Sequence, residues 1–132
     1  MHLALRCAKR QRELLQTGTV INISSVAGRK TFAGLGVYCA TKHAVHALTE
    51  TVREEVADHN VRVVNIAPGN VKTAIWDQAI PEEKKENHPA FNRKEYENLS
   101  VDDIAKVVLF AYEQPQNVCI REIVLAPTRQ LK

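Results

Sequence analysis

Thr19-Val-Ile-Asn-Ile-Ser24 and Val61-Arg-Val-Val-Asn-Ile-Ala67 are two short runs rich in β-branched and apolar residues. Such runs are typical of strands that are buried on both faces of a sheet. Between them, residues 38–58 give the strongest helical pattern of the chain. A buried strand, a long helix and a second buried strand predict an α/β fold with parallel strands. The residues expected on the buried face of this helix are Thr41, Val45, Leu48, Val52 and Val56.

The alternation of helices and strands continues on both sides of these runs. Residues 3–16 are good helix formers and stop at Gly18. Ser100-Val-Asp-Asp103 predicts a capped helix start, and that helix is expected to end near Pro115. Residues 118–126 predict a third strand. The helix after Ser100 is expected to bury Ile104, Val107, Val108 and Ala111.

A small sheet of this kind leaves one feature unexplained. The first apolar strand normally lies in the middle of a larger sheet, and here it would expose an unpaired apolar edge. The chain is also expected to begin inside a helix. Both features predict further sequence upstream of Met1.

Composition excludes several classes of protein. The chain has 132 residues, of which 45% are hydrophobic and 25% charged, as expected for a single soluble domain. Its net charge of +3 is small and comes from scattered Lys and Arg residues, so nucleic-acid binding is not predicted. No window approaches the roughly 20 apolar residues that a membrane span needs. The three cysteines, Cys7, Cys39 and Cys119, form no metal-binding spacing, which favours the reducing cytoplasm.

Ser25, Tyr38 and Lys42 are the candidate catalytic residues. Tyr38 and Lys42 are four residues apart on the predicted helix, so their side chains share one face. A nearby cation favours the phenolate and makes tyrosine a better acid/base near neutral pH. Taken alone, the pair also fits a tyrosine that packs on the core beside a solvated lysine.

The surrounding residues favour the catalytic reading. Val20 to Gly28 and Val37 to Ala44, together with Asn65-Ile-Ala-Pro-Gly69 and Thr73, resemble the active-site signature of the short-chain dehydrogenase/reductase family. The resemblance extends over residues 3–126. It implies a Rossmann-like, doubly wound parallel sheet, of which residues 1–132 supply the C-terminal portion: about three strands with their flanking helices.

The resemblance also implies a role for each motif residue. Tyr38 would be the acid/base, Lys42 would lower the pKa of Tyr38 and hold the nicotinamide ribose, and Ser25 would position the substrate oxygen. Residues 74–99 would form the substrate loop, and Trp76 is a candidate for its pocket. The remaining residues expected to contact the cofactor, NADP or NAD, are Pro68, Gly69, Val71 and Thr73.

The implied reaction is reversible hydride transfer between the nicotinamide cofactor and a secondary alcohol or ketone. The family's glycine-rich phosphate loop is missing, because the five glycines are residues 18, 28, 34, 36 and 69. We therefore expect the 132 residues alone to be inactive. The alternative function is a noncatalytic remnant, or a fragment that acts only with another chain.

Two further features bear on substrate and assembly. Ile120 to Gln130 resembles the tails of bacterial NADP-dependent 3-hydroxy acid and serine dehydrogenases of this family. His43 and His46 have no third ligand placed with them, so no metal site is predicted. A stripe of small residues on the central helix either packs on the sheet or forms a subunit interface, and it consists of Ala40, Ala44, Ala47 and Thr51. The resemblance favours the interface and implies a homodimer or homotetramer, because the corresponding helix commonly packs between subunits in this family.

Overall fold

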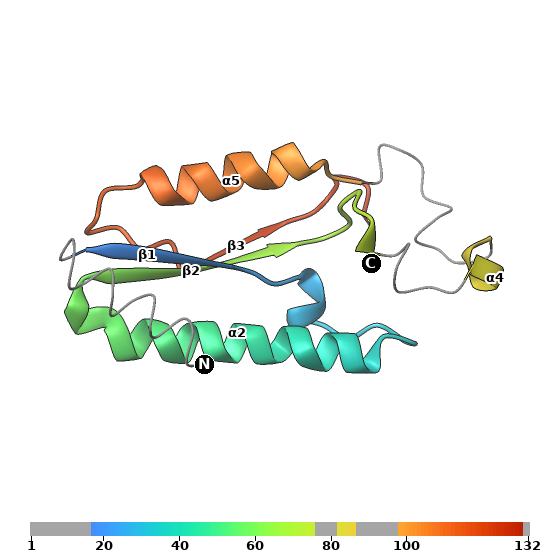
Figure 1. Cartoon of the computed structure of the whole chain (residues 1–132), viewed down its shortest axis with the longest axis horizontal. Coiled ribbons are helices and arrows are strands. Elements are labelled where there is room, and N and C mark those ends of the chain that lie inside the picture. The colour runs from blue at the N-terminus through green and yellow to red at the C-terminus, as the bar shows by residue number, and fades with distance from the viewer. Residues whose placement is uncertain (1–16, 76–81, 87–97, 131–132) are drawn as a thin grey trace.

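The computed structural model describes residues 17–75, 82–86 and 98–130, and they form a sheet with a helix on each face. Strands β1 (Gly18–Ile23), β2 (Val61–Pro68) and β3 (Glu122–Leu125) are parallel and lie in the order β1-β2-β3. Helix α2 (Gly36–Val56) covers one face and α5 (Val101–Glu113) covers the other (Figure 1). The predicted doubly wound α/β arrangement is therefore confirmed. The shorter helices are η1 (Val26–Gly28), η2 (Ala57–His59) and α4 (Glu82–Lys85).

Strand β2 is the centre of the core, and all eight of its residues are buried. Successive side chains point to opposite faces of the sheet. Val61 and Val63 therefore pack against Val52 and Val56 of α2. On the other face, Val64 and Ile66 contact Ala111 of α5. The two-sided burial explains why the β2 sequence is continuously apolar rather than alternating.

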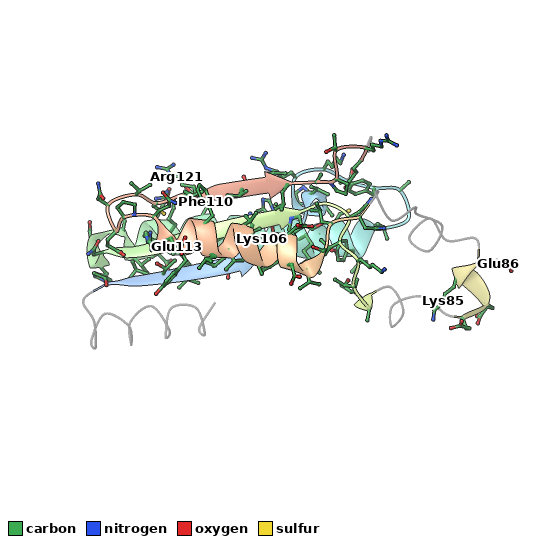
Figure 2. All side chains as sticks on the ribbon, turned by 90° about the horizontal axis from the view of Figure 1, so that it is seen from above. Lys85, Glu86, Lys106, Phe110, Glu113 and Arg121 are labelled. Carbon is green, nitrogen blue, oxygen red and sulfur yellow. The ribbon has the colours of Figure 1, made fainter. Side chains whose placement is uncertain are left out.

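Helix α5 follows its prediction. Ser100 caps it: its hydroxyl accepts a hydrogen bond from the Asp103 N–H at 3.1 Å, and the Asp103 carboxylate accepts one from the Ser100 N–H at 2.9 Å. Of the predicted inward residues, Val107, Val108 and Ala111 pack against the sheet, whereas Ile104 lines a pocket. Lys106 and Phe110 lie on the outer side, as Figure 2 shows. The cap holds the N-terminus of α5, and a buried arginine holds its C-terminus.

That arginine is Arg62 of β2, which is 6% exposed. Its guanidinium donates to the Tyr112 carbonyl at 2.8 Å and to the Gln114 carbonyl at 2.6 Å, both at the C-terminal end of α5. It also donates to Thr19 Oγ1 at 3.0 Å. Arg62 satisfies carbonyls that a helix end leaves without partners, and it ties α5 to the sheet.

Two local predictions are wrong. Thr41 and Leu48 are exposed, because α2 turns Cys39 and Thr49 to the sheet along with Val52. The third strand is shorter than predicted, since it begins at Glu122 rather than at residue 118. The preceding residues instead wrap around Arg62, whose guanidinium lies 3.5 Å from the Val118 carbonyl.

The predicted helix over residues 3–16 and the candidate Trp76 lie outside the described residues. Most of the segment 74–99 does so too, but its ends meet. Val71 bridges to Leu99, and the Lys72 N–H donates to the Leu99 carbonyl at 2.9 Å. In the described part of the chain, no helix combines the length and apolarity needed to cross a bilayer.

Candidate active site

A pocket with a volume of about 440 Å³ opens where β1 and β2 end. The carboxyl ends of parallel strands are the usual place for a ligand site in a doubly wound sheet. The volume falls in the range of small-molecule sites. All seven residues predicted for the catalytic and cofactor sites line this pocket: Ser25, Tyr38, Lys42, Pro68, Gly69, Val71 and Thr73.

Ser25 follows β1 and begins the turn of η1. Its Oγ accepts a hydrogen bond from the Ala27 N–H at 3.1 Å, so the hydroxyl caps the short helix. The residue is only 9% exposed, and its exposed part faces the pocket. This capping contact uses Oγ as an acceptor, so the hydroxyl hydrogen remains available to a ligand oxygen.

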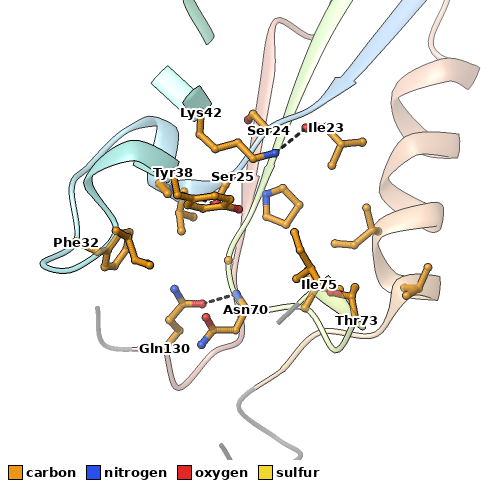
Figure 3. Close-up of a pocket in the computed structure, with 18 residues that line it drawn as sticks. Ile23, Ser24, Ser25, Phe32, Tyr38, Lys42, Asn70, Thr73, Ile75 and Gln130 are labelled. Carbon is orange, nitrogen blue, oxygen red and sulfur yellow. Dashed lines mark hydrogen bonds between the residues drawn. The ribbon is translucent and has the colours of Figure 1, made fainter. Parts of the chain in front are cut away.

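Tyr38 and Lys42 reach the pocket from the first turns of α2. The Lys42 Nζ lies 5.7 Å from the centre of the Tyr38 ring and donates to the Ile23 carbonyl at 3.5 Å. Figure 3 shows both side chains on the same side of the pocket as Ser25, with Thr73 and Ile75 opposite. Partial burial lowers the pKa of Lys42 below its usual value of 10.5, because the ammonium loses hydration.

The turn after β2 forms the floor of the pocket. The Gly69 N–H donates to the Leu125 carbonyl at 2.7 Å, which joins the turn to the end of β3. A Cβ on Gly69 would overlap the Gln130 side chain and lie 2.9 Å from the Ala126 Cβ. The close packing of this turn explains the need for glycine.

Gln130 is a pocket residue that the sequence analysis did not single out. Its Oε1 accepts a hydrogen bond from the Asn70 N–H at 2.9 Å, and its side chain lines the pocket. The sequence analysis considered this C-terminal stretch only for its resemblance to the tails of family members. The apolar part of the lining was missed as well and includes Phe32, Leu35, Ile75, Val101 and Ile104.

The arrangement combines a phenol, an ammonium and a hydroxyl in a largely apolar pocket. These are groups that can exchange a proton with a bound oxygen and stabilise the charge that develops there. Among residues 17–75, 82–86 and 98–130, no cluster of three His, Cys, Asp or Glu residues is placed to hold a metal ion.

The chain matches the family model described as short chain dehydrogenase over residues 4–84. A relative from Schizosaccharomyces pombe, the NADP-dependent 3-hydroxy acid dehydrogenase, is 34% identical over 113 residues, which cover 86% of this chain and 43% of the relative. An uncharacterized oxidoreductase from Staphylococcus saprophyticus is 33% identical over 118 residues, which cover 87% of this chain and 46% of the relative. The chain thus spans less than half the length of these curated relatives.

Solved structures agree with the sequence comparison. Serine dehydrogenase from Escherichia coli has a TM-score of 0.71 and 25% identity, and the match covers 96% of this chain and 48% of that one. The closed form of serine dehydrogenase complexed with NADP+ has a TM-score of 0.79 at 25% identity, covering 97% and 51%. On the family match, the curated relatives and the fold, this chain belongs to the short-chain dehydrogenase family.

Proposed function

We propose that this site performs reversible hydride transfer between NADP, or NAD, and a secondary alcohol or ketone. The observation that carries the proposal is that Ser25, Tyr38 and Lys42 line one pocket, with the Lys42 ammonium beside the Tyr38 ring. The family membership and the NADP+ complex of a similar structure support the choice of cofactor.

Tyr38 would exchange the proton of the reaction. In the reducing direction, the phenol gives its proton to the carbonyl oxygen while the carbonyl carbon receives the hydride, and the product is the alcohol. Tyr38 then regains a proton from solvent. In the oxidising direction, the phenolate takes the hydroxyl proton. The bound nicotinamide would supply or accept the hydride.

Lys42 and Ser25 would assist that proton transfer. The positive charge of Lys42 would stabilise the negative charge that develops on the Tyr38 oxygen as the proton leaves. The hydroxyl hydrogen of Ser25 is free of the Ala27 contact, so it can be donated to the substrate oxygen. Lys42 also suits the nicotinamide ribose, because an ammonium donates hydrogen bonds to hydroxyl groups.

The pocket floor would hold the nicotinamide end of the cofactor. The pocket wall includes Pro68, Gly69, Val71 and Thr73, which offer backbone groups and one hydroxyl. The pocket volume of about 440 Å³ suits the nicotinamide half of the cofactor, but the glycines at positions 18, 28, 34, 36 and 69 do not have the spacing of a glycine-rich phosphate loop. We therefore propose that the rest of the dinucleotide needs residues beyond these 132.

A 3-hydroxy acid or its keto form is the proposed substrate class. The support is the 34% identical relative, an NADP-dependent 3-hydroxy acid dehydrogenase, and the likeness of the tail sequence. We further propose a cytoplasmic enzyme that assembles as a homodimer or homotetramer. Cys39 and Cys119 are free thiols, and the small-residue stripe of α2 is exposed in the isolated chain.

The noncatalytic alternative is supported by how little of the relatives' length the chain spans. The chain spans 43% of the length of its 3-hydroxy acid dehydrogenase relative. Within the described residues, β1 pairs with β2 alone and leaves its other edge open. A second chain that completes the sheet would fit this edge.

Cofactor titrations distinguish the two functions. The 132-residue chain and the protein as its gene encodes it, with any sequence upstream of Met1 retained, are each titrated with NADPH by fluorescence. We expect saturable binding and reduction of 3-keto acids for the gene product, and neither for the 132 residues. Micromolar NADPH binding by the 132 residues would overturn the proposal that the phosphate site lies elsewhere. A gene product that binds NADPH but reduces no carbonyl compound would favour the noncatalytic alternative.

A further inference from the structure

A row of polar side chains crosses the sheet beneath α2, behind the pocket. Asn22, Asn65 and Glu122 are register partners on β1, β2 and β3, and they lie on the face that α2 covers. Asn65 is only 4% exposed. Asn22 donates to Thr49 Oγ1 of α2 at 2.9 Å. Buried polar groups in a sheet core require partners, so such a row implies a specific role.

His46 of α2 is the centre of this row. Its Nε2 lies 2.8 Å from Ser24 Oγ, and its Nδ1 lies 3.4 Å from Glu122 Oε1. The Glu122 carboxylate also accepts from Asn65 Nδ2 at 3.3 Å and pairs with Arg29 at 2.8 Å. One imidazole thereby connects the end of β1 to β3.

The carboxylate of Glu122 sets the orientation of the imidazole. The carboxylate, 3.4 Å from Nδ1, favours the neutral tautomer that carries its hydrogen on Nδ1, which leaves Nε2 as an acceptor. The single hydroxyl hydrogen of Ser24, which can also be donated to the Ile66 carbonyl at 3.2 Å, is then donated to Nε2 at 2.8 Å. Because this hydrogen bond between Ser24 and His46 is directional, it holds the Ser24 side chain in one orientation.

His46 also supports the turn that follows Ser25. A Cβ on Gly28 would overlap the His46 ring and lie 2.8 Å from the Lys42 carbonyl. The backbone of η1 therefore rests directly on the imidazole and on α2. Because Ser25 caps η1, the position of this turn sets the position of the Ser25 hydroxyl.

Ser24, His46 and Glu122 have the order of a hydrolytic triad, but Ser24 is only 5% exposed. Its Oγ also lies 3.2 Å from the Ile66 carbonyl. Ser24 borders the pocket, but its Oγ is enclosed between the His46 ring and the Ile66 carbonyl. The contacts hold the backbone in place instead.

We propose that His46 is a positioning residue: held by Glu122, it fixes Ser24 and the η1 turn, and so places Ser25 beside Tyr38 and Lys42. The inference rests on the proposed function of that site. It gives His46, a side chain behind the pocket, the role of holding the Ser25 hydroxyl in position for the reaction.

Two substitutions separate the contacts of the imidazole. The amide of glutamine extends about as far as Nε2, so His46→Gln retains a partner for Ser24. The amide of asparagine extends only as far as Nδ1, so His46→Asn keeps the Glu122 side and loses Ser24. In the protein as its gene encodes it, we expect His46→Asn to lower kcat roughly tenfold or more, because small misplacements of catalytic groups are costly. The KM for the cofactor should change little. His46→Gln is expected to retain most of kcat.

His43→Asn is the matched control. His43 lies on the same helix and is exposed, and its Nδ1 contacts only the Cys39 carbonyl among the contacts described for it, at 2.8 Å. Its kcat should equal that of the wild type. Thermal unfolding of each variant shows whether the protein is folded at the assay temperature. If His46→Asn does not fold, Ser24→Ala replaces it, since it removes a single oxygen atom and is expected to lower kcat in the same way.

A measurement without turnover tests the geometry. Nitrogen NMR of the protein as its gene encodes it, at a pH where the ring is neutral, should show the Nδ1–H tautomer for His46. The Nε2–H tautomer would contradict the proposal. An unchanged kcat in both His46→Asn and Ser24→Ala would also contradict it. Equal losses of kcat in His46→Gln and His46→Asn would do the same. If Tyr38→Phe also kept full activity, the proposed function itself would fail, and the two failures are thus distinguishable.

Discussion

The Gln130 side chain accepts a hydrogen bond from the Asn70 N–H at 2.9 Å, which joins the C-terminal segment to the turn after β2. The two residues are 60 positions apart in the chain, and both line the pocket. The C-terminal segment is therefore part of the wall that would hold the nicotinamide end of a cofactor, rather than a support for the fold alone.

Replacing Gln130 is expected to weaken cofactor binding. Gln130→Met keeps the length of the side chain but leaves the Asn70 N–H without its partner. A net hydrogen-bond contribution of about 1 kcal/mol predicts a roughly fivefold weaker affinity for NADPH. Fluorescence titration of the gene product measures it. Gln116→Met is the control, because Gln116 contacts the Asn60 carbonyl outside the pocket. Equal affinities in wild type and Gln130→Met would contradict the assignment.

Lys42→Met should remove activity without removing stability. Burial lowers the pKa of Lys42, so the folded state holds its proton less tightly than the unfolded state. The free energy of unfolding therefore increases as the pH rises from the lowered pKa toward 10.5, and below the lowered pKa the buried ammonium opposes folding. Urea unfolding at neutral pH should find Lys42→Met at least as stable as the wild type. A clear loss of stability would show that Lys42 is structural.

Arg62→Met tests how α5 is held to the sheet. The substitution leaves the Tyr112 and Gln114 carbonyls without the guanidinium in a buried place. We expect a loss of roughly 2–4 kcal/mol in the free energy of unfolding, because more than one buried acceptor loses its donor. Chemical denaturation followed by circular dichroism measures the loss. Arg62→Lys should recover part of it, whereas a neutral effect of both changes would show that these contacts contribute little.

The N-terminal cap of α5 predicts that the stability of the protein falls at acidic pH. The hydrogen bonds from Ser100 lower the pKa of Asp103 below 3.8, with a smaller contribution from the charge of Lys106. The stability that the ionised carboxylate contributes is present above pH 3.8 and is lost as the pH falls through the lowered pKa. Asp103→Asn should therefore lower Tm at neutral pH, and the difference from wild type should shrink in strong acid. Ser100→Ala is expected to cost about 1 kcal/mol near neutral pH.

Much of the fold and of the motif could be predicted because the signals are local. Ser25 ends a recognisable strand, and Tyr38 and Lys42 are spaced by one turn of a strongly periodic helix. The buried face of α2 was misjudged because Cys39 and Thr49, rather than larger apolar residues, meet the sheet.

The parts that could not be predicted depend on contacts between distant segments. The side chains of Ser24, His46 and Glu122 meet only after three strands and a helix are assembled. Nothing in the spacing of these residues marks them as neighbours, and His46 was considered only as half of a histidine pair. The register of the three strands is what brings the polar row into line.

The turnover of Tyr38→Phe tests the central claim most directly. The change removes only the phenolic oxygen and leaves the ring beside Lys42. Measured as NADPH oxidation with a 3-keto acid, in the protein as its gene encodes it, kcat should fall by roughly 100-fold or more while NADPH still binds. A variant that turned over at the wild-type rate would show that Tyr38 does not transfer the proton, and the assignment of this site would be wrong.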